Sequence, residues 1–208
     1  MQLSYRQLEA TLAAYLNVNP DKIGTFRSRM KQLQRLEFPA GVNIGRGVRM
    51  TYSAEHLLQL AVAFEVIGTG LAAKAATDLV SQFWNRFQAA FGRAHNRLCF
   101  GAEPETFVCM AGRPPVEAER PFLDAVTVHD LPSLSETVLA ADALNTPMRA
   151  GMILIRADYI LERINRLARD VGQVASAKWS PEYRQWSDSR DASQQLWDYA
   201  DGGSKVPF

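Results

Sequence analysis

The apolar residues at the start of the chain recur at helical spacing and predict two helices joined by a turn. The first helix is expected in residues 4–18, where Ser4 followed three residues later by Gln7 fits a capping box. Pro20, in the turn "NVNPD", suits the first turn of the second helix. The apolar faces consist of Leu8, Leu12, Tyr15 and Leu16 in the first helix, and of Ile23, Phe26, Met30, Leu33 and Leu36 in the second.

Two short runs of alternating apolar residues follow and predict a two-stranded hairpin over residues 41–52. Gly45 and Gly47 between the runs supply the positive-φ freedom that a tight hairpin turn needs. Arg46 is therefore expected at the tip of the hairpin, and Arg49 on its polar face. The alternating apolar positions are Val42, Ile44, Val48, Met50 and Tyr52.

Helical spacing returns over residues 53–68 and, roughly, over residues 72–91. Ser53 is the expected N-cap of the first of these helices. Apolar periodicity lapses near Gly92 and the sign of the charge changes soon after, which favours a domain boundary there. Two domains are predicted, residues 1–92 and residues 93–208.

The second half of the chain mixes strands and helices. The segments "ETFVCMAG" (105–112) and "DAVTVHDL" (124–131) are typical of strands, and "SLSETVLAADAL" (133–144) is typical of a helix. Residues 151–171 are predicted to begin extended and to end as a helix. A last helix is predicted near Pro181. Its aromatic residues Trp179, Tyr183 and Trp186 form either a packed stripe or, in a sharper interpretation, a surface for a partner.

Within residues 151–171, apolar residues spaced four and three apart form a seam. Such spacing is typical of a coiled coil, so this helix is the candidate for dimerisation. Because the seam is shorter than three heptads, burial in the protein's own core is the alternative interpretation. The residues predicted to contact a second copy are Ile153, Ile160, Ile164, Leu167 and Val171.

The composition is that of a folded protein, with 47% hydrophobic and 22% charged residues in 208. We expect a mainly α fold with short β elements, in which a winged helix-turn-helix precedes a mixed α+β region. No apolar run reaches the roughly 20 residues of a membrane span, and the N-terminus lacks the pattern of a signal peptide. A cytoplasmic protein without a membrane partner is expected.

The net charge of +1 conceals an asymmetry between the two halves. Residues 1–97 contain 12 Lys and Arg and 6 Asp and Glu, a net charge of +6, whereas residues 98–208 contain 11 and 16, a net charge of −5. Such a division favours a polyanionic partner for the first half.

Three segments resemble the DNA-binding domain of the MerR family. "TFRSRMKQLQRLEFP" is similar to the family's basic recognition helix, and "GVRMTYSAEHLLQL" to the exit of its hairpin wing. "VIGTGLAAKAATDLV" resembles the turn that joins the last two helices of that domain. The resemblance implies a dimeric, bacterial or phage regulator whose recognition helix enters the DNA major groove, while the wing contacts the DNA backbone or the minor groove.

The residue types at these positions suit DNA, since Arg and Lys contact base edges and phosphates, and hydroxyl groups contact phosphates. A solvated basic face is the alternative interpretation. The candidate DNA-binding residues are Lys22, Thr25, Arg27, Ser28, Arg29, Lys31 and Arg35 on the second helix, and Arg46, Arg49 and Tyr52 in the hairpin.

The sequence therefore favours a sequence-specific regulator that binds double-stranded DNA as a homodimer. A small molecule or a protein, such as RNA polymerase, is a further candidate partner for residues 93–208. The alternatives are an interaction or small-molecule sensor module, and a DNA-bending architectural protein of a mobile element. No catalytic motif is present, and Cys99, Cys109 and His129 do not have the spacing of a metal site. We expect neither enzymatic activity nor a cofactor.

Overall fold

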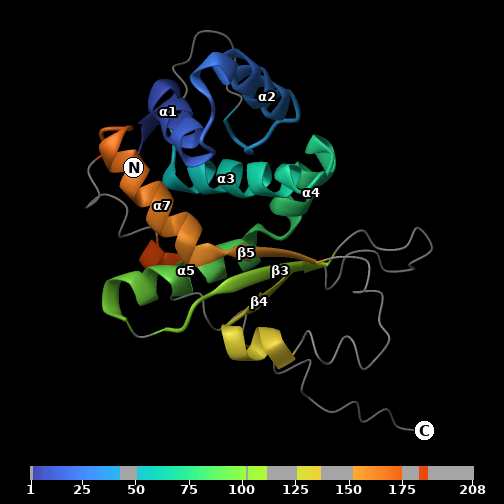
Figure 1. The fold of residues 1–208 in the computed structure, drawn as a ribbon, viewed down its shortest axis with the longest axis vertical. Coiled ribbons are helices and arrows are strands. Elements are labelled where there is room, and N and C mark those ends of the chain that lie inside the picture. The colour runs from blue at the N-terminus through green and yellow to red at the C-terminus, as the bar shows by residue number, and fades with distance from the viewer. Residues whose placement is uncertain are drawn as a thin grey trace, which may run out of the picture.

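The computed structural model describes residues 2–42, 51–101, 103–111, 126–136, 152–174 and 183–186. The fold is mainly helical with short β elements, as predicted, and its strands form two small antiparallel sheets (Figure 1). In chain order the elements are β1 (Leu3–Ser4), α1 (Tyr5–Tyr15), the 3-10 helix η1 (Pro20–Lys22), α2 (Ile23–Arg35), β2 (Thr51–Tyr52), α3 (Ala54–Gly68), α4 (Ala73–Gln82), α5 (Trp84–Phe100), β3 (Phe107–Ala111), β4 (Val126–His129), a short helix at residues 131–136, β5 (Met152–Arg156) and α7 (Ala157–Asp170).

The first two helices form as predicted. The Gln7 backbone N–H donates to Ser4 Oγ at 3.3 Å, and the Ser4 N–H donates to Gln7 Oε1 at 2.9 Å, which completes the capping box at the start of α1. In the turn that follows, Asn19 caps η1 by accepting a hydrogen bond from the Asp21 N–H. The predicted apolar faces are buried at Leu8, Leu12 and Tyr15 in α1 and at Phe26, Met30 and Leu33 in α2.

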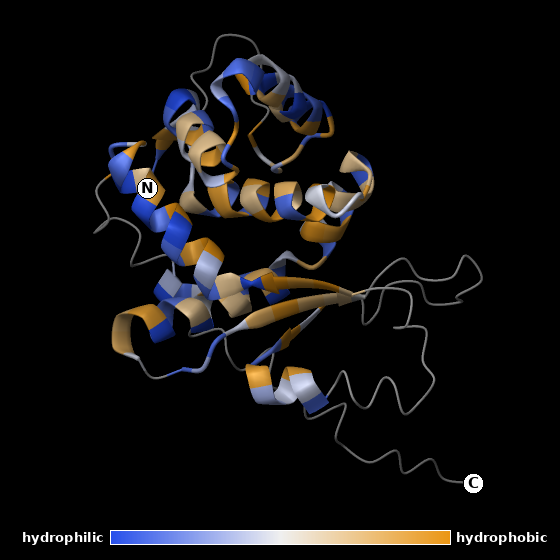
Figure 2. Cartoon of the chain, viewed as in Figure 1, coloured by the Kyte–Doolittle hydropathy of each residue, from blue (hydrophilic) through white to orange (hydrophobic). Residues whose placement is uncertain are grey.

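Helix α3 lies across the centre of the molecule, between α1 and α2 on one side and α5 on the other (Figure 1). Nine of its 15 residues are buried, and Figure 2 shows apolar residues along most of its length. A helix that is apolar on most sides is typical of a core position. Ser53 is its N-cap, as predicted, and His56 completes a capping box with it.

The helix predicted over residues 72–91 is two helices, because the chain turns at Phe83 between α4 and α5. The apolar spacing continues through this turn, since Leu79, Phe83, Trp84 and Phe87 are all buried. Helix α5 is joined to α3 by Glu55, which accepts hydrogen bonds from Trp84 Nε1 and Gln88 Nε2. The periodicity therefore predicted the buried residues correctly but not the bend between the two helices.

The second sheet has the strand order β4-β3-β5, and both pairs of neighbours are antiparallel. All three strands were predicted. Helix α5 packs against the sheet, and Leu134 of the helix at residues 131–136 forms a small separate core with Phe107 and Cys109. Strand β5 continues directly into α7, so the predicted change from extended chain to helix falls between Arg156 and Ala157.

One hydrophobic core contains residues from both predicted domains. It includes Leu8 and Phe64 from the first and Val108 and Ile164 from the second. The predicted boundary falls inside α5, where Gly92 is buried in the middle of the helix. The division after residue 92 therefore does not separate two cores among the described residues.

The C-terminal residues that the structure describes pack against α5. Tyr183 is buried, and its ring centroid lies 5.3 Å from that of Trp186 and 5.4 Å from that of His95. Trp186 also contacts Trp84 edge to face. These two residues thus belong to a packed aromatic stripe, the first of the two predicted alternatives, whereas Trp179 lies outside the described residues. Within the described part, no helix is long and apolar enough to span a membrane.

The contact between α1 and α7 leaves no room at Gly172. A Cβ atom there would lie 2.7 Å from the Ala168 carbonyl oxygen and 2.8 Å from Thr11 Oγ1. We expect Gly172→Ala to lower the free energy of unfolding by about 1–3 kcal/mol, as overpacking does elsewhere. Gly24→Ala is the control, because a Cβ atom on that exposed helical residue meets nothing within 4 Å; it should raise stability by up to about 1 kcal/mol. Urea unfolding measures both, and equal midpoints would contradict the close packing described.

Candidate nucleic-acid interface

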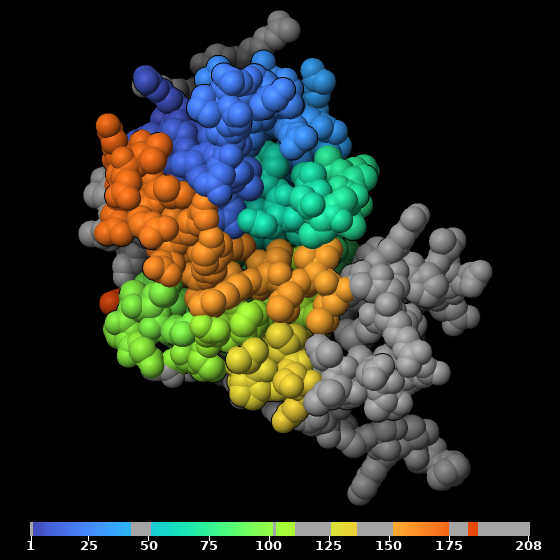
Figure 3. Space-filling model, viewed as in Figure 1, coloured from blue at the N-terminus to red at the C-terminus, as the bar shows by residue number. Residues whose placement is uncertain are grey.

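The predicted DNA-binding residues of the second helix all lie on the exposed side of α2 or directly before it. Phe26, Met30 and Leu33 are buried against the core and fix the rotation of the helix about its axis. The remaining positions therefore face outward, and Figure 2 shows hydrophilic residues on this outer side. Helices α1 and α2 form one end of the molecule in Figure 3, opposite the end formed by residues 131–136. The exposed candidates are Lys22, Thr25, Arg27, Ser28, Arg29, Lys31 and Arg35.

The turn of about 100° per residue divides the exposed side of α2 into three rows. The middle row consists of Gly24, Ser28 and Arg35. The row beside α1 consists of Arg27 and Lys31, and the row beside α3 and α4 consists of Lys22, Thr25, Arg29 and Gln32. The small residues of the middle row are thus flanked by cations on both sides.

Arg27 is held by α1. Its Nη2 lies 2.8 Å from Glu9 Oε1, and its Nε donates to both carboxylate oxygens of Glu9 at 2.9 and 3.0 Å. The hydrogen bonds and the negative charge of Glu9 raise the pKa of the Arg27 guanidinium above its usual value. Arg27 thus orients α2 on α1, and its charge is already compensated, unlike the charges of Arg29, Lys31 and Arg35, which form no ion pair with any residue in the described ranges.

The structure corrects the prediction for Tyr52, which we expected to contact the sugar-phosphate backbone. Alternate residues of a strand point to opposite sides, and in β2 Thr51 faces outward while Tyr52 faces the core with 1% of its surface exposed. Its hydroxyl accepts a hydrogen bond from Gln34 Nε2 at 3.0 Å. Burial raises the pKa of the Tyr52 hydroxyl. Tyr52 fixes β2 against α2 and is not available to a phosphate.

The tip of the predicted hairpin lies outside the described residues, and with it Arg46 and Arg49. Of the second predicted strand, residues 51 and 52 are described. They pair antiparallel with Leu3 and Ser4 at the N-terminus. This pairing places the end of the predicted hairpin at the start of α1, on the end of the molecule that carries α2 (Figure 1).

A groove of about 940 Å³ runs beside α2. The row Lys22, Thr25, Arg29 and Gln32 forms one side of it. The ends of α1 and α3 and the beginning of α4 form the others. Sequence patterns did not reveal this groove, because it exists only where three helix ends meet a fourth helix.

The predicted dimerisation seam is mostly buried within the protein's own chain. Ile160 and Ile164 are in the core, and Ile153 and Leu167 pack against it, whereas Val171 is 45% exposed. Helix α7 packs on α1 and α5, where Gln7 Nε2 donates to the Gly172 carbonyl at 3.0 Å. The interpretation of this seam as a dimer interface was therefore wrong for the buried residues, and its alternative, burial in the core, is confirmed.

The described residues include no group of three or more His, Cys, Asp or Glu side chains that could hold a metal ion. Cys109 is buried in β3, and burial raises the pKa of its thiol. His129 is buried in the neighbouring strand, with its Nε2 at 2.7 Å from Thr127 Oγ1, and burial lowers its pKa. Cys99 lies on α5, 3.4 Å from His95 Nε2. Cys99 thus contacts His95, and His129 contacts Thr127.

Comparison of the chain with family models, with curated proteins and with solved structures found no match.

Proposed function

We propose that this chain is a regulator that binds double-stranded DNA through α2, within a MerR-like winged helix-turn-helix. The observation that carries the proposal is the charge of α2. Ile23–Arg35 contains four basic residues and no acidic residue. All four basic side chains are exposed. An α-helix fits the major groove of DNA, where such side chains reach base edges and the flanking phosphates.

The arrangement of the exposed rows supports the same proposal. The middle row begins with Gly24, which has no Cβ atom, and Ser28, whose side chain is small, so the helix can approach base edges closely. Packing does not require a glycine at position 24, since its missing Cβ atom would meet nothing within 4 Å. Arg29 and Lys31 lie in the rows on either side, in reach of the two phosphate backbones that border a groove.

The competing interpretation is a basic face that contacts only solvent. It does not account for the repulsion between neighbouring positive charges on α2. Arg27 and Lys31, and again Lys31 and Arg35, are four residues apart on one helix. Like charges at this spacing destabilise a helix by about 0.2–0.5 kcal/mol per pair. Glu9 offsets this repulsion only at Arg27. A bound polyanion would offset the repulsion at Lys31 and Arg35.

We retain the homodimer as part of the proposal. A single winged domain buries little surface on DNA, and readers of this kind act as two-fold dimers on paired half-sites. The contact must use a surface other than Ile160 and Ile164, which are buried. Sedimentation of the protein bound to a duplex containing its target would give the number of copies.

The experiment that tests the proposal is selection of DNA by the full chain. Purified protein is incubated with random and genomic duplex fragments at two salt concentrations, and the retained fragments are sequenced. We expect a two-fold-symmetric motif, and binding that weakens with salt because phosphate contacts release counterions. Retention of no fragment, or equal retention of all fragments at low salt only, would contradict the proposal.

A further inference from the structure

The groove beside α2 has walls of two kinds. Phe26, Phe64 and Ile67 give it an apolar wall formed by α2 and α3. Lys22, Thr25, Arg29 and Gln32 give it a polar edge. These four residues are spaced three, four and three apart, so they form one continuous row along α2.

The charged side chains that line the groove are all positive. Its lining contains two cations, Lys22 and Arg29, and no acidic residue. Neither cation forms an ion pair with a residue in the part of the chain that the structure describes. An anion is therefore the complementary ligand, and Thr25 and Gln32 can donate hydrogen bonds to it. The apolar wall requires the rest of the ligand to be apolar.

The dimensions suit a small molecule. Ligand sites in proteins occupy roughly 300–1,000 Å³, with mostly apolar walls and a few polar groups that orient the ligand. The groove, at about 940 Å³, lies within this range. Since one side is open, a ligand can enter without a rearrangement of the helices.

We propose that this groove binds a small amphipathic anion and that the bound anion competes with DNA. The apolar part of the ligand lies against the half-buried Leu16 and Ile67, over the rings of Phe26 and Phe64, which are 4% and 7% exposed. Its anionic group pairs with Arg29, in the field of Lys22. The same two cations belong to the face that we assign to DNA, so this competition rests on the proposed function. Because the two ligands share these charges, each must lower the affinity for the other by the same factor.

A pair of fluorescent probes separates charge from apolar contact. The probe 8-anilino-1-naphthalenesulfonate carries an anionic sulfonate, and N-phenyl-1-naphthylamine has the same aromatic body without it. Both are titrated into the full chain in the absence of DNA. Arg29→Gln should weaken binding of the sulfonate about fivefold and leave binding of the neutral probe unchanged. Ala73→Leu, which adds volume inside the groove, should weaken both.

Lys31→Gln is the matched control, because it removes one positive charge from the same helix outside the groove. It should change binding of neither probe. Thermal unfolding of each variant is compared first, since loosened cores also bind the sulfonate probe. Equal weakening of sulfonate binding by Arg29→Gln and Lys31→Gln, or by neither, would overturn the groove as the binding site.

Competition is then measured with a duplex that the protein retains. We expect the sulfonate probe to weaken DNA binding and the duplex to displace the probe. If the probe binds in the groove and DNA binding does not change, the competition is overturned while the proposed function stands. If no duplex is retained although Arg29→Gln weakens probe binding, the proposed function fails and the anion site is supported.

Discussion

Replacing Lys31 and Arg35 together by glutamine should weaken binding of duplex DNA by at least about tenfold and lower the slope of log affinity against log salt by about 2. Both side chains are exposed on α2, and neither forms an ion pair within the described residues. Two phosphate contacts would therefore be lost without damage to the fold. Fluorescence anisotropy of a labelled duplex over a series of salt concentrations measures both quantities.

The matched control removes the same charge from another part of the molecule. Arg166 and Arg169 are exposed on α7, and the double change of both to glutamine also lowers the net charge by two. We expect this control to change the affinity much less and the salt slope hardly at all. Equal losses in the two double variants would mean that only net charge matters, and α2 would not be the interface.

Local patterns predicted most elements of this fold, but neither β1 nor the turn between α4 and α5. The capping residues Ser4 and Ser53 act as N-caps, and the strands β3, β4 and β5 lie within the segments whose composition indicated them. The exposed side of α2 also follows from its sequence, because three buried residues fix the orientation of the helix. Each of these features depends on interactions within a few residues, which is the range that a sequence pattern reports.

Features that depend on distant contacts were not predictable in the same way. An apolar seam such as Ile160 and Ile164 requires a partner, but its spacing does not distinguish a second copy from α1 and α5 of the same chain. The ion pair between Arg27 and Glu9 likewise depends on how α1 crosses α2. The position of Tyr52 depends on β1 and on Gln34, which contact it from outside its own strand and which the local pattern of that strand does not contain.

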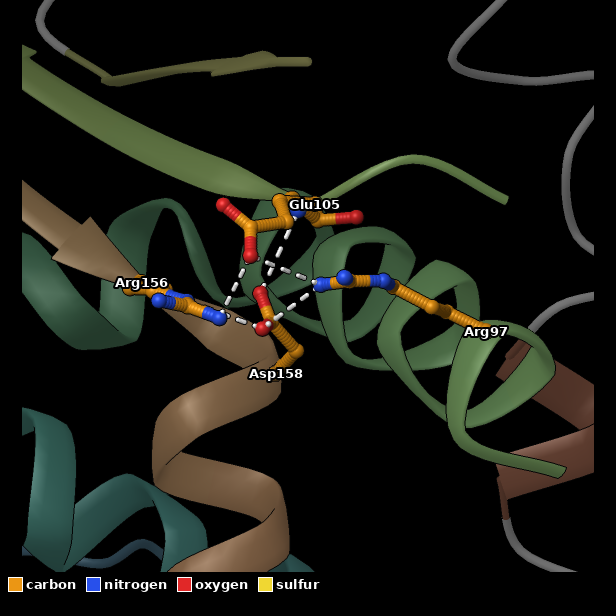
Figure 4. A network of polar contacts seen from close by, with 5 residues as sticks. Arg97, Glu105, Arg156 and Asp158 are labelled. Carbon is orange, nitrogen blue, oxygen red and sulfur yellow. Dashed lines mark hydrogen bonds and ion pairs between the residues drawn. The ribbon is translucent and has the colours of Figure 1, made fainter. Parts of the chain in front are cut away.

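A change at Asp158 should have the largest effect on stability. Its carboxylate is 3% exposed and accepts hydrogen bonds from Arg97 at 3.0 Å, from Arg156 at 2.9 Å and from the Thr106 backbone N–H at 3.3 Å (Figure 4). Asp158 therefore links its own helix α7 to α5, through Arg97, and to Thr106 directly before β3. Asp158→Ala removes the buried acceptor of the Thr106 N–H and one of the two acidic partners of Arg97 and Arg156, which keep Glu105. We expect the free energy of unfolding to fall by about 3 kcal/mol.

A second variant, Glu105→Ala, distinguishes the effect of burial from the effect of charge on the free energy of unfolding. Glu105 pairs with the same two arginines, at 3.3 Å from Arg97 and 2.7 Å from Arg156, but its side chain is 32% exposed. Water screens such a pair, so Glu105→Ala should cost less than about 1 kcal/mol. Urea unfolding of both variants measures the difference, and equal costs would show that the buried position of Asp158 contributes nothing.

A change in this polar network should lower the stability of the protein without changing its affinity for DNA. Asp158 lies on α7, which packs on α1, α3 and α5, whereas α2 packs on α1 and α4. The ion pair between Arg27 and Glu9 joins α2 to α1. At concentrations of urea where both proteins remain folded, Asp158→Asn should bind the retained duplex as tightly as the unchanged chain, although it unfolds at a lower concentration. A loss of DNA affinity in the folded Asp158→Asn protein would mean that the placement of α2 depends on this network, so that the two halves of the chain act as one unit in binding.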